Sequence, residues 1–482
     1  MPDVLTAVPA GAFALSAGDR ERLGLRLQDG VRRARRLRTG EVLVAITVAL
    51  PADADPAAIV VASRRGDEPW FCFEQPDRER AALATLGTVR TLGGSGDGRF
   101  ADVARAWREL GAHAIVDPGD GPRGSGPVAV GGFSFAPAGG ASPHWAGFDP
   151  ASLHVPQVAI ARRGDEVRLT LAALVRPDDD PEALVAALDA RADGLRSSPL
   201  PLLDPDPTER CRVVSAMPPE HYEGAVARAV ERIRAGDLDK IVLAREVQVH
   251  APAAHDAAAV FGVLREAFRE CHVFVVGRGD AAFLAASPEL LVRREGLRAG
   301  TVALAGSARR SADPSVDAHL GEQLLRSAKD REEQAIVTRR ITQALRSRSV
   351  WVTAADEPVI ARIANIQHLA TPIRAQLREP VSAVELASIL HPTPAVGGEP
   401  HDVAAPLIPA LEGLDRGWYA GPVGWTDMNE DGEFCVALRS ALLTGTVARC
   451  YAGVGVVRDS DPAAELAETE VKLQALLPVL AS

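Results

Sequence analysis

Two pairs of acidic residues have the spacing of one helical turn and together would suit a metal ion. Glu465 and Glu468 are three residues apart, and Lys472 follows on the same face if the segment is helical. Asp330 and Glu333 repeat this spacing elsewhere in the chain. Carboxylate oxygens from two such helices are ligands that suit Mg²⁺. The alternative is that both pairs belong to ordinary solvated helix surfaces.

Single ionisable residues in apolar segments are candidates for acid–base chemistry. Lys240 begins the apolar run KIVLAREV, where loss of solvent would lower its pKa towards that of a general base. The alternative is a surface lysine that flanks a strand. Glu289, in SPELL, has apolar neighbours that would raise its pKa and make it a general acid. The alternative is a glutamate at a helix N-terminus.

Two further polar residues fall inside predicted strands. Arg439 interrupts the apolar run CVALRSALL, and a buried arginine requires an anionic partner. This residue is therefore a candidate for binding an anionic ligand. His368 lies within NIQHLATPI, where the alternative to a functional role is a core histidine with satisfied hydrogen bonds.

Periodicity and cap residues predict the elements that carry these side chains. We expect a helix over 222–235 that ends at Gly236, a strand over 240–249 and a hairpin about Gly296. A long helix over 316–347 would present Asp330 and Glu333 on its polar face. A last helix would be opened by Ser460-Asp461-Pro462, since an N-cap residue followed by proline near the first helical position is typical of a helix start.

The chain divides at a proline-rich connector over 196–208, which separates an N-terminal half, 1–207, from a C-terminal part, 208–482. The first part contains strand-like runs at 41–50, 128–137 and 167–175. Strands alternate irregularly with helices along the whole chain. The pattern therefore predicts a mixed α/β architecture with largely antiparallel sheets.

Composition excludes several classes of protein. The 482 residues carry a formal net charge of −11, which argues against nucleic acid as the main partner. No apolar run is long enough to span a membrane, and the first 20 residues lack the basic segment of a signal peptide. The five cysteines form no CxxC motif, so neither a disulfide framework nor a thiolate zinc site is indicated. We therefore expect a soluble, cytoplasmic protein. We also expect a monomer whose partner is a small molecule rather than nucleic acid or a membrane.

Ten segments in order resemble the chorismate-binding enzyme family, over about Pro218 to Leu480. They are LDKIVLAREV (238–247), SPELLVRREG (287–296), LAGSARR (304–310), KDREEQAIV (329–337), NIQHLATPI (365–373), HPTPAVGG (391–398), DRGWYAGPVGW (415–425), CVALRSALL (435–443), YAGVGVV (451–457) and ELAETEVKL (465–473). GGFSFAP (131–137) also looks like the isochorismate-forming branch. The resemblance implies an α+β type of α/β fold, with packed antiparallel sheets flanked by helices, and chorismate as the substrate.

The resemblance also assigns roles to individual residues. It makes Glu333 and Glu468 the ligands of Mg²⁺, with Asp330 and Glu465 nearby. It makes Lys240 the base and Glu289 the acid. The positions that correspond to substrate contacts are Gly306, Ser307, His368, Ala395, Val396, Arg439, Gly453 and Lys472.

Two positions in the resemblance select the nucleophile. Family members that attach an amine to chorismate typically lack a lysine where Lys240 stands, whereas those that form isochorismate or salicylate use it to activate water. The run over 303–307, ALAGS, also lacks the lysine with which some aminodeoxychorismate synthases form an adduct. The resemblance therefore implies attack of water at C2 of chorismate, with loss of the C4 hydroxyl, to give isochorismate for menaquinone, siderophore or salicylate biosynthesis. The alternatives are a salicylate synthase, which also eliminates pyruvate, and a non-catalytic chorismate-binding homologue.

Overall fold

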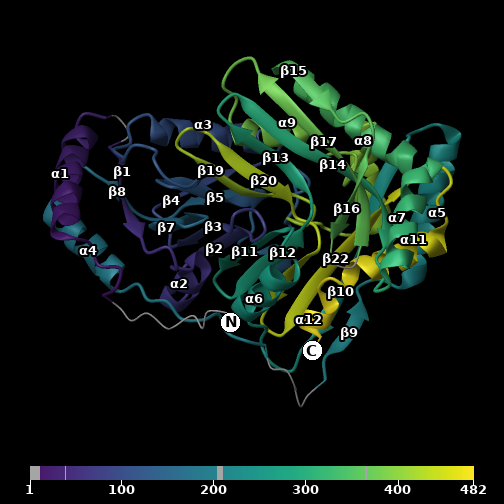
Figure 1. Ribbon diagram of the computed structural model, residues 1–482, viewed down its shortest axis with the longest axis horizontal. Helices are drawn as coiled ribbons and strands as arrows, with labels where there is room; N and C mark the ends of the chain where they lie inside the picture. Colours follow the sequence, from purple (N-terminus) through teal and green to yellow (C-terminus); the bar gives the residue numbers. More distant parts are fainter. Residues whose placement is uncertain (1–10, 38–39, 204–209, 364–365, 482) are drawn as a thin grey trace.

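The computed structural model describes residues 11–37, 40–203, 210–363 and 366–481, which form two packed antiparallel sheets surrounded by helices (Figure 1). The larger sheet contains, in spatial order, β1 (Val42–Leu50), β8 (Glu166–Val175), β7 (Val158–Arg163), β3 (Ala81–Leu86), β2 (Trp70–Gln75), β11 (His272–Arg278), β12 (Ala281–Ser287), β21 (Ser440–Thr444), β22 (Val447–Val456), β10 (Lys240–His250) and β18 (Gly398–Glu399), with β9 (Arg212–Ser215) paired to β10.

The smaller sheet lies against one face of the larger one. Its order is β15 (Ser349–Ala354), β17 (Ile366–Leu377), β14 (Arg298–Arg309), β13 (Leu290–Glu295), β20 (Gly432–Val436), β19 (Pro422–Asp427), β5 (Val128–Phe133), β6 (Ala151–Val155) and β4 (Arg90–Gly94), with β16 (Val359–Ile363) paired to β17. Both sheets take strands from either side of the 196–208 connector, since β2 pairs with β11 and β5 with β19. The 207/208 boundary itself lies outside the described residues.

Helices pack on the strands of both sheets (Figure 1). Their bounds are α1 (Ala17–Ala34), α2 (Pro56–Ser63), α3 (Arg99–Gly111), α4 (Pro181–Asp193), α5 (Pro219–Ala235), α6 (Ala257–Ala267), α7 (Pro314–Arg326), α8 (Ala328–Arg346), α9 (Ala383–Leu390), α10 (His401–Glu412), α11 (Pro462–Leu473) and α12 (Leu477–Leu480). α1, α2, α4 and α6 pack on strands of the larger sheet, whereas α3, α7, α8 and α9 pack on strands of the smaller sheet.

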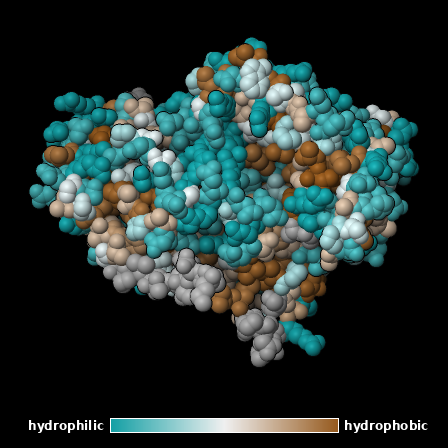
Figure 2. Space-filling model, viewed as in Figure 1, coloured by the Kyte–Doolittle hydropathy of each residue, from teal (hydrophilic) through white to brown (hydrophobic). Residues whose placement is uncertain are grey.

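The core follows the two-residue period of the strands. In β1, Leu43 and Ala45 belong to the apolar cluster between the sheets, whereas Val42, Val44 and Ile46 belong to the cluster under the outer helices. The face of the molecule in Figure 2 is largely hydrophilic, with smaller apolar areas. Within the described ranges, no helix has the length and apolarity needed to cross a bilayer.

Most predicted elements are confirmed. The predicted helix over 222–235 is α5, which ends at Gly236 with a left-handed φ of 87°. The strand over 240–249 is β10, and the hairpin about Gly296 joins β13 to β14. The last helix is α11, in which the Asp461 side chain accepts a hydrogen bond from the backbone N–H of Ala464.

Two predictions about elements are wrong. The long helix over 316–347 is two helices, α7 and α8, because Ser327 is extended and its side chain caps α8 by accepting from the N–H of Asp330. The run CVALRSALL is not one strand, because the chain leaves the smaller sheet after β20 and enters the larger sheet at β21. Arg439 lies in this crossing, with a left-handed φ of 50°.

Candidate active site

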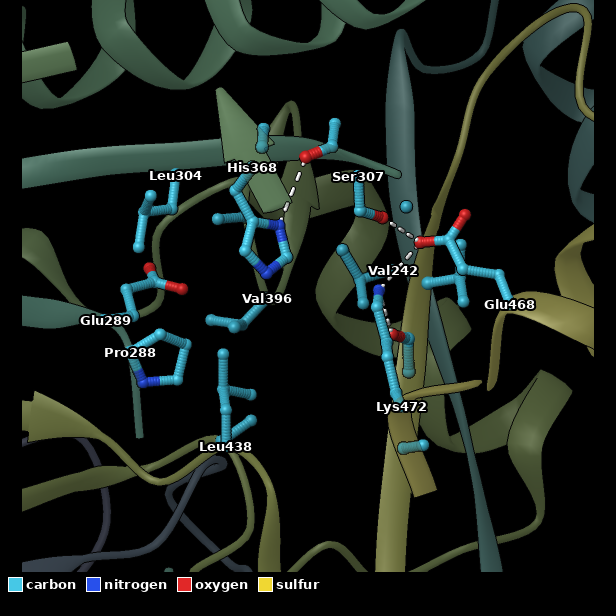
Figure 3. Close-up of a pocket in the computed structure, with 18 of the residues that line it drawn as sticks. Val242, Pro288, Glu289, Leu304, Ser307, His368, Val396, Leu438, Glu468 and Lys472 are labelled. Atoms are coloured by element: carbon cyan, nitrogen blue, oxygen red, sulfur yellow. Dashed lines mark hydrogen bonds and ion pairs between the residues drawn. The ribbon is translucent and has the colours of Figure 1, made fainter. Parts of the chain in front are cut away.

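A pocket of about 950 Å³, partly open to solvent, gathers nearly all the residues singled out from the sequence. Its walls come from β10 and β22 of the larger sheet, β14 and β17 of the smaller sheet, the N-terminal half of α8, and one face of α11. Figure 3 shows Glu289 and Leu438 on one side of this pocket and Ser307, Glu468 and Lys472 on the other.

Glu289 lies where the chain crosses from the larger sheet to the smaller one, between β12 and β13. It is not at a helix N-terminus. Its residue surface is only 4% exposed, and burial raises the pKa of its carboxyl to about 7, although Lys240, Thr393 and Lys472 partly oppose this rise. A carboxyl with this pKa is largely protonated just below neutral pH, which suits a proton donor.

Arg439 lies at the return crossing, and His368 orients it. His368 belongs to β17, and burial followed by the charge of Arg439 lowers its pKa to about 3, so that its ring is neutral. Because its Nδ1 lies 3.1 Å from the carbonyl oxygen of Gly306, that nitrogen carries the hydrogen. Its Nε2 then accepts a hydrogen bond of 3.0 Å from Nη2 of Arg439. The other terminal nitrogen of Arg439, Nη1, is buried and has no hydrogen-bond partner among the described residues. Apart from an interaction with the thiol of Cys271, the guanidinium is thus available to an anionic ligand.

Lys240 and Glu333 form a buried ion pair beside the pocket. Nζ of Lys240 lies 2.7 Å from Oε1 of Glu333, and the lysine side chain is completely buried. Gly455 of β22 lines the pocket next to both groups, and a Cβ atom at this position would overlap Glu333 and come within 2.8 Å of Cε of Lys240. The absence of a side chain at Gly455 therefore leaves room for this pair. Lys240 is not a surface lysine, although it does not itself form the pocket wall.

Glu468 has its own lysine. Its Oε1 lies 2.9 Å from Nζ of Lys472 and accepts a hydrogen bond of 2.6 Å from the hydroxyl of Ser307. Lys472 also donates to the carbonyl oxygen of Gly453, at 2.9 Å. Burial alone would raise the pKa of Glu468, but Lys472 and Ser307 outweigh it and lower the pKa. Glu468 is therefore held as a carboxylate.

The two remaining carboxyls, Asp330 and Glu465, line the same pocket. Burial raises the pKa of both, and Glu468 adds to the rise through charge repulsion. Glu465 is paired with Lys329, whose Nζ lies 2.9 Å from its Oε1. Asp330 lies against Gly306, which has a left-handed φ of 67° and where a Cβ would come within 2.9 Å of Cβ of Asp330. Glycine is required there by both conformation and space.

The acidic cluster fits a divalent cation that takes few protein ligands. Within the described residues, no three His, Cys, Asp or Glu side chains are arranged to hold a metal ion by themselves. Glu333 and Glu468 nevertheless face one pocket from two helices, and each is neutralised by a lysine. Mg²⁺ commonly takes one or two carboxylates and completes its coordination with water and substrate oxygens. The donor set is of that type.

The structure also places residues at the pocket that the sequence did not single out, namely Lys329, Arg416, Tyr419 and Tyr451. Arg416 is buried and donates to the carbonyl oxygens of Val396 and Val242, which fixes two walls of the pocket relative to each other. Arg416 did not stand out in the sequence, because nearly all the positively charged residues of this chain are arginines. Ala395 and Val396, which were expected at the substrate, line the pocket.

Comparison with known proteins agrees with this geometry. The family model described as chorismate binding enzyme matches residues 30–481, which is most of the chain. The chain belongs to the chorismate-binding enzyme family. This finding confirms the predicted family and, with the two-sheet structure, the predicted fold.

Relatives within the chorismate-binding family match over most of their length. A salicylate biosynthesis isochorismate synthase of Pseudomonas aeruginosa is 39% identical over 429 residues, which cover 89% of this chain and 88% of that protein. The isochorismate synthase MenF of Bacillus subtilis is 35% identical over 359 residues, 74% of this chain and 75% of that one. The solved structure of MenF, the menaquinone-specific isochorismate synthase of Escherichia coli, has a TM-score of 0.77 at 26% identity and covers 95% of this chain and 100% of that one.

Proposed function

We propose that this protein is an isochorismate synthase, an isomerase that converts chorismate to isochorismate with Mg²⁺. The observation that carries the proposal is that one pocket combines Glu289, a buried carboxyl with a pKa of about 7, with a lysine-neutralised pair of carboxylates on the facing helices. The names of the relatives point to the same reaction.

Two cationic groups bind the carboxylates of chorismate. Nη1 of Arg439 has no hydrogen-bond partner in the described part of the chain and can donate to the substrate, and the neutral ring of His368 orients the guanidinium group. Lys472 lies at the other side of the pocket, within reach of both Glu468 and the incoming substrate. The remaining substrate contacts are small or apolar and leave room for the ring; they are Gly306, Ser307, Ala395, Val396 and Gly453.

The reaction exchanges one hydroxyl for another. Lys240, which is paired with Glu333 as an ammonium in the structure, must first lose a proton. As the free amine it then takes a proton from water, and the resulting hydroxide attacks C2 of chorismate. The ring double bonds shift, and the bond between C4 and its oxygen breaks. Glu289 donates its proton to the departing oxygen, which leaves as water. One water is consumed and one is released, so the net reaction is an isomerisation.

Glu333 and Glu468 would hold Mg²⁺, with Asp330 and Glu465 close by. The ion, when bound, neutralises a substrate carboxylate and withdraws electron density from the ring. Every described residue that lines the pocket lies between Val242 and Lys472, so we assign the chemistry to the part over 208–482 and the variable part of the fold to 1–207. We place the enzyme in the cytoplasm, as a monomer that acts without nucleic acid or membrane.

Product analysis tests this function. The protein is incubated with chorismate and Mg²⁺ at neutral pH, the products are separated by chromatography, and pyruvate is followed with lactate dehydrogenase. We expect isochorismate with little salicylate and no pyruvate. Pyruvate released in equal amount to the chorismate consumed would instead identify a salicylate synthase. Binding of chorismate without any product would identify a non-catalytic homologue.

A further inference from the structure

Lysine is almost absent from this protein, and every lysine it has lies at the acidic cluster. Three of the 53 lysine and arginine residues are lysines: Lys240, Lys329 and Lys472. Each is paired with a different glutamate of the cluster, at 2.7 to 2.9 Å. Everywhere else the chain uses arginine for positive charge. At the cluster the chain thus carries the compact ammonium group, whereas a guanidinium is larger, planar and spreads its charge over three nitrogens.

Lys329 is the one lysine to which the proposed reaction gives no role. It lies in the first turn of α8, where its side chain is 40% exposed, and it binds Glu465 in the first turn of α11, which is 2% exposed. The pair thus joins a partly solvated cation that lines the pocket to a buried carboxylate on another helix. Between side chains of α8 and α11, it is the single ion pair that the described residues contain.

Lys329 and Glu465 are each close in sequence to one of the two proposed metal ligands. Lys329 precedes Glu333 by four residues on α8, and Glu465 precedes Glu468 by three residues on α11. Each member of the pair is therefore about one helical turn from a ligand on its own helix. A contact that fixes the distance between Lys329 and Glu465 also fixes the distance between Glu333 and Glu468.

We propose that Lys329, through its compact ammonium group, is a positioning residue that braces α8 against α11 and so sets the separation of the two carboxylates that bind Mg²⁺. This inference rests on the proposed function for the metal site itself. Groups that orient metal ligands without touching the metal typically contribute 10- to 100-fold to metal affinity. Lys329 acts in that way, through Glu465 and the two helices.

The direction in which Mg²⁺ affinity changes on removal of Lys329 distinguishes a positioning role from a purely electrostatic one. Removing a positive charge beside a cation site would by itself strengthen Mg²⁺ binding, because the repulsion between Lys329 and the ion disappears. Loss of the brace weakens binding instead. A variant in which the charge is lost and Mg²⁺ binds less tightly therefore identifies positioning rather than electrostatics.

The test is calorimetric titration of the chorismate-free protein with Mg²⁺. We compare Lys329→Met with Arg331→Met, a matched control that removes an exposed ion pair to Glu357 from the same turn of α8. We expect a dissociation constant about 10-fold or more higher for Lys329→Met, and an unchanged one for Arg331→Met. Lys329→Arg keeps the charge but has the wrong shape, so its affinity should also fall below that of the wild type.

Each other outcome overturns the inference. Unchanged or tighter Mg²⁺ binding by Lys329→Met, with circular dichroism and melting temperature like the wild type, refutes the brace. Equal weakening by Arg331→Met would show that α8 is merely destabilised, and wild-type affinity of Lys329→Arg would refute the need for an ammonium group. The proposed function fails separately, because then the wild type itself would neither bind Mg²⁺ nor form isochorismate.

Discussion

The replacement of Glu289 by glutamine tests the acid–base argument through stability as well as through rate. Glu289 is 4% exposed, and burial raises the pKa of its carboxyl from 4.5 to about 7. Each pKa unit corresponds to about 1.4 kcal/mol, so the folded state favours the neutral over the ionised carboxyl by about 3 kcal/mol more than the unfolded state does. Because the pKa is higher in the folded state, this stability is fully present below pH 4.5 and is lost as the pH rises through 7.

Glutamine has the shape of the neutral acid and cannot ionise. The free energy of unfolding of Glu289→Gln should therefore exceed that of the wild type by a margin that grows between pH 5 and pH 8, by about 2 to 3 kcal/mol. Urea denaturation at both pH values measures the margin. Glu166→Gln, which changes an exposed carboxyl on β8, is the control and should show no such growth.

The same substitution removes the proton donor. Loss of a general acid typically lowers the rate by about 10²- to 10⁴-fold, while chorismate binding should persist because the shape is kept. In the wild type, kcat/KM should fall as the pH rises through 7, because Glu289 loses its proton there. A margin of stability that does not change with pH, together with a rate that stays constant from pH 6 to 8.5, would refute the assignment of Glu289 as the buried acid.

Three other changes have definite expected outcomes. Lys240→Ala should lower isochorismate formation by about 10²- to 10⁴-fold. Lys240→Arg should be equally inactive, since a guanidinium does not give up its proton. Near wild-type turnover by either folded variant would exclude Lys240 as the base. Treatment with EDTA should abolish turnover, and added Mg²⁺ should restore it, whereas full activity after rigorous chelation would exclude the metal. Gly455→Ala should displace Glu333 and weaken Mg²⁺ binding measured by calorimetry. Gly300→Ala is the control and should bind Mg²⁺ normally, because a Cβ atom at Gly300 would have no neighbour within 4 Å among the described residues. Equal affinities of the two variants would contradict the crowding at Gly455.

The sequence predicted the elements of the fold better than the places where they join. α5, β10 and α11 follow from apolar periodicity and from local caps such as Gly236 and Asp461, which act within a few residues. The break at Ser327 was missed because the polar pattern continues through it, and only the cap geometry shows that a second helix begins there. The partition of strands between two sheets depends on long-range pairing, which no local pattern encodes.

The site was predicted mainly through the family resemblance, because spacing alone left every candidate with an ordinary alternative. The structure brings Asp330, Glu333, Glu465 and Glu468 to one pocket although the two pairs are more than 100 residues apart. The crossings between sheets explain why Arg439 appeared to be inside a strand: apolar residues continue on both sides of it, in different sheets. Lys329 could have been noticed from composition, since lysine is a rare residue in this arginine-rich chain.

In the proposed reaction, water replaces the C4 hydroxyl of chorismate, and the new hydroxyl is at C2. Turnover in water enriched in ¹⁸O, stopped at low conversion and followed by mass spectrometry, tests it most directly. Each isochorismate formed should carry one ¹⁸O, located at C2. Isochorismate without ¹⁸O would mean that the hydroxyl migrates within the substrate, and it would contradict the roles of both Lys240 and Glu289.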